Sequence, residues 1–291
     1  MGLPRLVIAS LVGAVAVACA GPPTARHDPA WRLNYVAMGD SVAAAPGVPD
    51  PAPPPGCRKS TNNYPSVLAR RLLATKFVDV SCSGATSEDI TRRAQQTESG
   101  AIARQIDALS ATTDLITITI GANDVGLAAD VEGCVVKSAN PRPCADEFVV
   151  GDVDRISAVI SAQVPVWSAL IDGVRGKAPK ARIILVGYGV FVRPGGCFPG
   201  QPVLPGDSDY LQSKLNELDD RQRQLAAEKG IDYFDTRLLS RGHDMCAPPG
   251  DRYIEGYAAT GPAIPLHPTA FGAASVGSAL AGYIDSPGTR K

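Results

Sequence analysis

The sequence predicts an α/β fold, in which a five-stranded, mainly parallel sheet lies between two layers of helices as a three-layer α/β/α sandwich. Two observations predict it. Short apolar runs alternate along the chain with segments of helical periodicity. No internal repeat or second linker divides residues 32–291, which we therefore expect to form one domain. The apolar runs predicted to be strands are 33–38, 77–82, 114–120, 182–188 and 231–235.

Four longer segments have the spacing of helices, with apolar residues recurring on one face. The third of them is expected to be capped by Asp207 and closed by Gly230. The connecting segments are expected to be helical in part at 87–109, irregular at 128–150, and loops at 48–56 and 189–206. The predicted helices are 63–73, 153–176, 207–229 and 269–284.

Composition excludes some classes of partner. The chain has a formal net charge of −1 and no block of like charges. This argues against a nucleic-acid partner and gives no reason to expect an anionic membrane surface. A small-molecule substrate and a monomeric state are the expectations that remain.

The N-terminus is predicted to be a targeting segment. Arg5 precedes an apolar run at 6–18 that is too short to span a membrane, so residues 1–20 are interpreted as a signal peptide. Ordinary cleavage near Ala20 and a lipoprotein signal that leaves Cys19 lipidated are both open. Residues 21–31 are interpreted as a polar, proline-rich tether. We expect the protein to be secreted or associated with the cell envelope.

Six further cysteines follow the signal region. An even number of cysteines in an exported domain predicts three disulfides, for which 15 pairings exist. Zinc binding is the rival interpretation, but no pair has C-x-x-C spacing and no histidine lies at ligand spacing, so no metal is expected. The six are Cys57, Cys82, Cys134, Cys144, Cys197 and Cys246.

Three residues follow the first three predicted strands, where chemistry gathers in parallel sheets. Ser41 lies in a tight turn after the first strand and is a candidate nucleophile. The Asn123 amide and the N–H groups of Ser41 and Gly84 are candidate donors for an oxyanion hole. Each residue alone could equally be an ordinary helix cap or turn residue.

The search for a base is short because the chain has three histidines. His27 lies in the predicted tether. His243 follows a glycine near Cys246, and His267 precedes Pro268 at the start of the last predicted helix. The residues themselves leave both His243 and His267 open, with position favouring His267.

Together, these residues resemble the four sequence blocks of the SGNH (GDSL) hydrolases, in the same order and over residues 33–285. The resemblance implies the flavodoxin-like α/β fold of that family, with Ser41 and His267 catalytic. It implies an oxyanion hole made of Ser41, Gly84 and Asn123, and no cofactor. The blocks are Gly39-Asp40-Ser41, Gly84, Gly121-Ala122-Asn123-Asp124 and His267-Pro268.

The cysteines resemble those of the secreted bacterial esterase and lipase branch of the family, which has three sequential disulfides. By that resemblance the pairs are Cys57–Cys82, Cys134–Cys144 and Cys197–Cys246.

One departure concerns the acid of the triad. Most members of the family have an aspartate three residues before the histidine, where this chain has Ile264. Some members of the disulfide branch use a main-chain carbonyl instead, so the Ile264 carbonyl is expected to orient His267. A carboxylate that folds back, Asp244 or Glu255, is the alternative.

The resulting hypothesis is a secreted serine esterase or lipase that forms an acyl-enzyme on Ser41. A carbohydrate O-deacetylase and a non-catalytic module that binds envelope lipid or glycan remain as alternatives. The sequence leaves the acyl-chain length open, because the loops at 42–57, 125–150 and 189–206 shape the pocket.

Overall fold

The structure is a computed structural model that describes residues 1–2 and 32–286. The chain divides into two units, Met1–Trp31 and Arg32–Lys291. Residues 3–31 hold most of the predicted signal peptide, Cys19 and the predicted tether, and these predictions therefore lie outside the described residues.

The predicted sheet is present, and its five strands are all parallel. The strand order is β11-β10-β7-β1-β4, so β1 and β7 lie at its centre. Four strands are shorter than predicted. The predicted strand at 77–82 ends already at Asp79, where the Asp79 carboxylate accepts hydrogen bonds from the N–H and hydroxyl of Ser81 and turns the chain. The strands are β1 (Asn34–Gly39), β4 (Lys76–Asp79), β7 (Leu115–Thr119), β10 (Arg182–Val186) and β11 (Asp232–Phe234).

The four predicted helices are also present, as α2 (Tyr64–Arg71), α6 (Arg155–Lys177), α7 (Pro205–Lys229) and α9 (Ala270–Asp285). Gly230 ends α7 in the left-handed conformation, as expected. The predicted cap Asp207 is wrong, because Pro205 already begins the helix and the Asp207 carboxylate instead accepts from the Ala145 N–H.

Shorter elements fill the connections. The segment expected to be irregular contains α4 (Leu127–Gly133) and α5 (Ala145–Phe148). The others are α1 (Ser41–Ala44), α3 (Ser87–Thr91), α8 (Arg237–Ser240), the 3-10 turns η1 (Pro55–Cys57), η2 (Gln105–Ala108) and η3 (Pro249–Asp251), and the short strands β2 (Pro51–Ala52), β3 (Lys59–Ser60), β5 (Gln95–Thr97), β6 (Gly100–Ile102), β8 (Val149–Val150) and β9 (Val153–Asp154).

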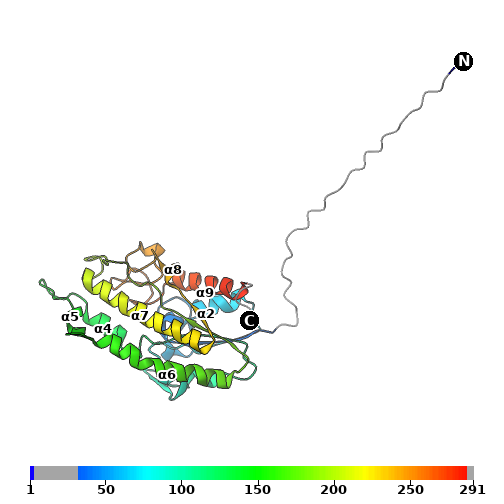
Figure 1. The fold of residues 1–291 in the computed structure, drawn as a ribbon, viewed down its shortest axis with the longest axis horizontal. Helices are drawn as coiled ribbons and strands as arrows, with labels where there is room; N and C mark the ends of the chain where they lie inside the picture. Colours follow the sequence, from blue (N-terminus) through cyan, green and yellow to red (C-terminus); the bar gives the residue numbers. More distant parts are fainter. Residues whose placement is uncertain (3–31, 287–291) are drawn as a thin grey trace. The chain divides into compact units, whose positions relative to one another are not determined.

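The two faces of the sheet are buried against different helices, which gives the predicted three layers. Side chains alternate along β1, so Tyr35 packs in the cluster that includes α2 and α9. Its neighbour Val36 packs in the larger cluster with α6 and α7. Figure 1 shows α6 beside α7 and α2 beside α9. Coverage of both faces explains why the strands are continuous apolar runs rather than alternating ones.

Three disulfides join the six cysteines in the sequential pattern that the family resemblance implied: Cys57–Cys82, Cys134–Cys144 and Cys197–Cys246. This pairing leaves none of these six sulfurs free to bind zinc. The first disulfide lies beside the carboxyl edge of the sheet, where the candidate site residues gather.

Candidate active site

Ser41 is held in a fixed turn between β1 and α1. The Asp40 carboxylate caps the helix by accepting the Val42 N–H at 2.9 Å. Gly39 has a φ of +140°, and a Cβ there would lie 2.3 Å from the Thr119 carbonyl oxygen, so the turn requires glycine. The Gln105 side chain donates to the Gly39 carbonyl and accepts from its N–H, which fixes the end of the strand.

The predicted oxyanion donors lie on two neighbouring turns. Asn123 follows β7 and donates one amide hydrogen to the Ala85 carbonyl at 2.9 Å, which orients the amide and leaves its second hydrogen available. Gly84 has a φ of +80° and lies between Cys82 and Ala85. Within the described residues, the N–H groups of Ser41 and Gly84 donate to no acceptor. All three groups line one groove.

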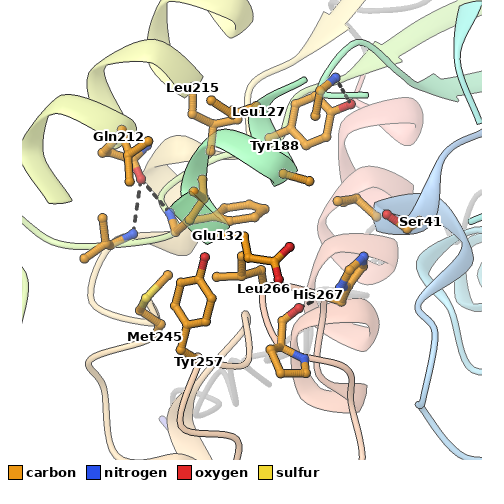
Figure 2. A pocket seen from close by; sticks show the side chains of 18 of the residues that line it. Ser41, Leu127, Glu132, Tyr188, Gln212, Leu215, Met245, Tyr257, Leu266 and His267 are labelled. Carbon is orange, nitrogen blue, oxygen red and sulfur yellow. Dashed lines mark hydrogen bonds between the residues drawn. The ribbon is translucent and has the colours of Figure 1, made fainter. Parts of the chain in front are cut away.

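His267 lies at the same groove, just before α9. Its Nδ1 lies 2.8 Å from the Pro265 carbonyl oxygen, which can only accept, so Nδ1 carries the hydrogen and Nε2 is left with a lone pair. Figure 2 shows the imidazole turned toward the Ser41 hydroxyl. No hydrogen bond joins the two in the described structure, and such bonds commonly tighten only when substrate binds.

The electrostatics of His267 suit a base. Burial lowers the pKa of the imidazole below its ordinary value, the bond to the Pro265 carbonyl opposes this, and the nearby positive charge of Arg58 lowers the pKa further. A neutral imidazole can accept a proton at neutral pH, whereas an imidazolium cannot.

The predicted orienting group needs a correction. The Pro265 carbonyl accepts the ring N–H of His267 at 2.8 Å. The Ile264 carbonyl accepts the main-chain N–H at 3.1 Å and acts on the imidazole more weakly, raising its pKa less than the Pro265 carbonyl does. Between these two carbonyls and His267, the turn contains Leu266 with a φ of +64°.

The alternative acids are engaged elsewhere. Asp244 is buried against Arg193 and the Cys246 N–H, and Glu255 binds Arg252 and the Gly261 N–H. The alternative base, His243, is also engaged elsewhere. It stacks on Tyr253, and its Nδ1 lies within hydrogen-bond distance of the Asp251 carbonyl.

Asp40 and Tyr188 form a buried polar pair beneath Ser41 that the sequence did not predict. The Tyr188 hydroxyl donates to the Asp40 carboxylate at 2.5 Å and accepts from the Ala122 N–H at 3.0 Å. It therefore ties the turn that bears Ser41 to the turn that bears Asn123. Burial raises the pKa of Asp40 to about 7, although the Tyr188 hydrogen bond opposes this. Tyr188 follows β10 at the same sheet edge, which is the signal that could have found it.

A second support lies under Asn123. The next residue, Asp124, accepts hydrogen bonds from the indole of Trp167 on α6 and from the N–H and hydroxyl of Ser87 on α3. These bonds anchor the turn after β7 to two helices.

Two hollows of different chemistry meet at Ser41 and His267. One is a cavity of about 430 Å³ lined mainly by apolar side chains, with Asp40 and Glu132 as acidic residues in its lining (Figure 2). Its walls come from α4, α7 and the loop after β10. The sequence predicted that the loops at 125–150 and 189–206 shape the pocket, but it did not predict the contribution of α7. The other is the groove of about 1020 Å³ that also holds Gly84 and Asn123. The larger apolar residues of the cavity include Val42, Leu127, Val131, Phe191, Val192, Val203, Leu211, Leu215, Met245, Tyr257, Ile264 and Leu266.

Comparison with known proteins agrees with this geometry. The model of the GDSL-like lipase/acylhydrolase family matches residues 37–274, which include Ser41, Gly84, Asn123 and His267. The chain belongs to this family. Like its relatives, this GDSL-like lipase/acylhydrolase is a carboxylic ester hydrolase.

Its relatives among characterised proteins include bacterial lipases. It is 36% identical to Lipase 2 of Streptomyces coelicolor over 284 residues, which cover 92% of this chain and 93% of the relative. Lipase 1 of the same organism is 29% identical, with 92% and 94% covered. Among solved structures, phospholipase A1 from Streptomyces albidoflavus NA297 is 27% identical with a TM-score of 0.72, over 88% of this chain and 100% of that one.

Proposed function

We propose that this GDSL-like hydrolase is an exported lipase or esterase that cleaves acyl esters through an acyl-enzyme on Ser41. One observation carries the proposal: the unprotonated Nε2 of His267 faces the Ser41 hydroxyl where an apolar cavity meets an open groove. This arrangement offers separate places for the two halves of an ester.

The mechanism follows from the groups at this junction. His267 takes the Ser41 proton as Oγ attacks the ester carbonyl carbon. The oxyanion accepts hydrogen bonds from the free N–H groups of Ser41 and Gly84 and from the second amide hydrogen of Asn123. Collapse of the tetrahedral intermediate breaks the bond between the carbonyl carbon and the alcohol oxygen, His267 gives that oxygen the proton, and the acyl group stays on Oγ. A water that His267 deprotonates then attacks the acyl-enzyme, releases the acid and restores Ser41.

The acyl chain is assigned to the apolar cavity. A cavity of about 430 Å³ lined mainly by apolar side chains favours a chain longer than acetyl, because burial of each methylene group is favourable by about 0.8 kcal/mol. This supports a lipid ester rather than an acetylated carbohydrate, and therefore disfavours the O-deacetylase alternative. The names of the relatives, lipase and phospholipase A1, agree with this assignment.

Export is supported by the three disulfides, which persist in oxidising compartments. The predicted signal peptide at residues 1–20 agrees with it. Lipidation of Cys19 would tether the enzyme to a membrane, and ordinary cleavage would release it; we expect a monomer in either case.

The test is Ser41→Ala against a chromogenic acyl ester, with Ser110→Ala as the control because Ser110 is exposed and lines neither hollow. Loss of the nucleophile should lower kcat by roughly 10⁴-fold or more with unchanged circular dichroism. A fluorophosphonate should label the wild type on the peptide that contains Ser41 and leave Ser41→Ala unlabelled. Retained turnover in Ser41→Ala would overturn the proposal.

A further inference from the structure

The groove beside Ser41 holds one cation without a partner. Arg58 lines the groove together with Ser41 and His267, and its side chain is exposed. In residues 32–286 its guanidinium has no hydrogen bond and no ion pair. It is close enough to His267 for its charge to lower the pKa of that imidazole.

The other charged residues that line the groove are either paired or acidic. The guanidinium of Arg93 is neutralised by Glu88 at 2.9 Å and Asp89 at 3.0 Å. Glu98 also lines the groove, on the turn between β5 and β6, and makes no ion pair within the described residues. Arg58 is therefore the uncompensated cation beside the catalytic histidine in the described part of the groove.

The backbone of Arg58 is held in place by hydrogen bonds and by the neighbouring disulfide. Arg58 has a φ of +52°, an uncommon conformation for a residue with a side chain. Its N–H donates to the Pro55 carbonyl, and the preceding Cys57 is joined to Cys82. The Cys57 carbonyl also accepts the Ser83 N–H, which ties this segment to the turn that holds Gly84.

We propose that the groove receives the alcohol half of the ester and that Arg58 selects alcohols that carry an anionic group, phosphate or carboxylate. The inference rests on the proposed function, because assignment of the acyl chain to the apolar cavity leaves the groove for the leaving group. A guanidinium offers a planar fork of donors that matches either anion, and the free donors of Arg58 provide such a fork.

The test compares butanoyl esters of four meta-substituted phenols, which bear a phosphate, a carboxylate, a neutral amide or a trimethylammonium group. The readout is kcat/KM for each charged ester divided by that for the amide, at pH 8, so intrinsic reactivities cancel between enzyme variants. Arg58→Gln should lower the ratio for at least one anionic ester by about fivefold and raise the ratio for the cationic ester. Arg58→Lys should restore most of the anionic preference, since it retains the charge.

The matched control is Arg92→Gln, which removes the same charge from an exposed residue that lines neither hollow. Its ratios should equal those of the wild type. Glu98→Gln should raise the anionic ratios, because it removes the opposing charge. Equal ratios in wild type and Arg58→Gln would overturn the inference, while hydrolysis of the neutral ester that depends on Ser41 would leave the proposed function standing.

Discussion

The Nδ1 atom of His267 lies 2.8 Å from the main-chain carbonyl oxygen of Pro265. A peptide carbonyl has no pKa in the physiological range, so it accepts from Nδ1 at any such pH and holds the neutral imidazole in one tautomer. Unlike a carboxylate, it adds no negative charge to stabilise the imidazolium.

The first prediction concerns this carbonyl. Pro265→Ala and Ile264→Ala both keep the main-chain oxygens, so each should lower kcat/KM by less than about threefold, whereas loss of the base in His267→Ala should lower it by several orders of magnitude. Steady-state kinetics with a chromogenic ester measures all three. A hundredfold loss in a folded Pro265→Ala or Ile264→Ala variant would show that a side chain, not the backbone, orients the base.

The second prediction concerns pH. Burial and the charge of Arg58 lower the pKa of His267, so the acid limb of the kcat/KM profile should lie below the ordinary histidine value of about 6.5. Activity is lost as the pH falls through this pKa, because the imidazolium cannot accept the Ser41 proton.

Arg58→Gln should move that acid limb to higher pH, because it removes a charge that disfavours the imidazolium. Arg92→Gln serves as the control and should leave the limb in place. Superimposable profiles for wild type and Arg58→Gln would contradict the electrostatic link between Arg58 and His267.

The third prediction separates catalysis from backbone strain at two glycines. Gly84 and Gly100 have φ values of +80° and +112°, and an added Cβ would meet nothing closer than 3.7 Å at either. Alanine at either position should lower the free energy of unfolding by about 1–2 kcal/mol. Gly84→Ala should also lower kcat, because its N–H shifts within the oxyanion hole, and Gly100→Ala should not. Denaturant titration and kcat of both variants check this, and equal kcat values would remove Gly84 from the oxyanion hole.

The fourth prediction concerns chain length. Leu215 on α7 lines the apolar cavity on the side away from Ser41 and His267 (Figure 2). Leu215→Phe should shorten the cavity and lower kcat/KM for decanoyl esters by about tenfold relative to butanoyl esters. Leu238→Phe, at an exposed residue outside the cavity, is the control. An unchanged chain-length profile would place the acyl chain elsewhere.

Much of the fold could be predicted from local pattern. The runs rich in β-branched residues, such as 114–120, become strands buried on both faces, and their ends bring Ser41, Gly84 and Asn123 to one edge. Residues 128–150 lacked such a pattern. Their short helices carry no long periodicity and are fixed by the Cys134–Cys144 disulfide and by contacts with α7, which a one-dimensional pattern does not contain.

The finer parts of the site depend on backbone geometry. The Pro265 carbonyl, rather than that of Ile264, accepts the ring N–H of His267 in a turn where Leu266 has a φ of +64°. Leucine does not favour this conformation, so the sequence did not predict it. The Tyr188–Asp40 hydrogen bond joins residues 148 positions apart. The role proposed for Arg58 depends on the absence of a partner near it in the described fold, which only coordinates reveal.

The Cys57–Cys82 disulfide braces two segments of the groove at once. It joins the segment next to Arg58 to the segment next to Gly84, so one covalent bond anchors both the groove cation and an oxyanion donor. Under the export proposed above, this bond would form in an oxidising compartment. We expect the reduced chain to hold both sides of the proposed nucleophile less firmly and therefore to be less active.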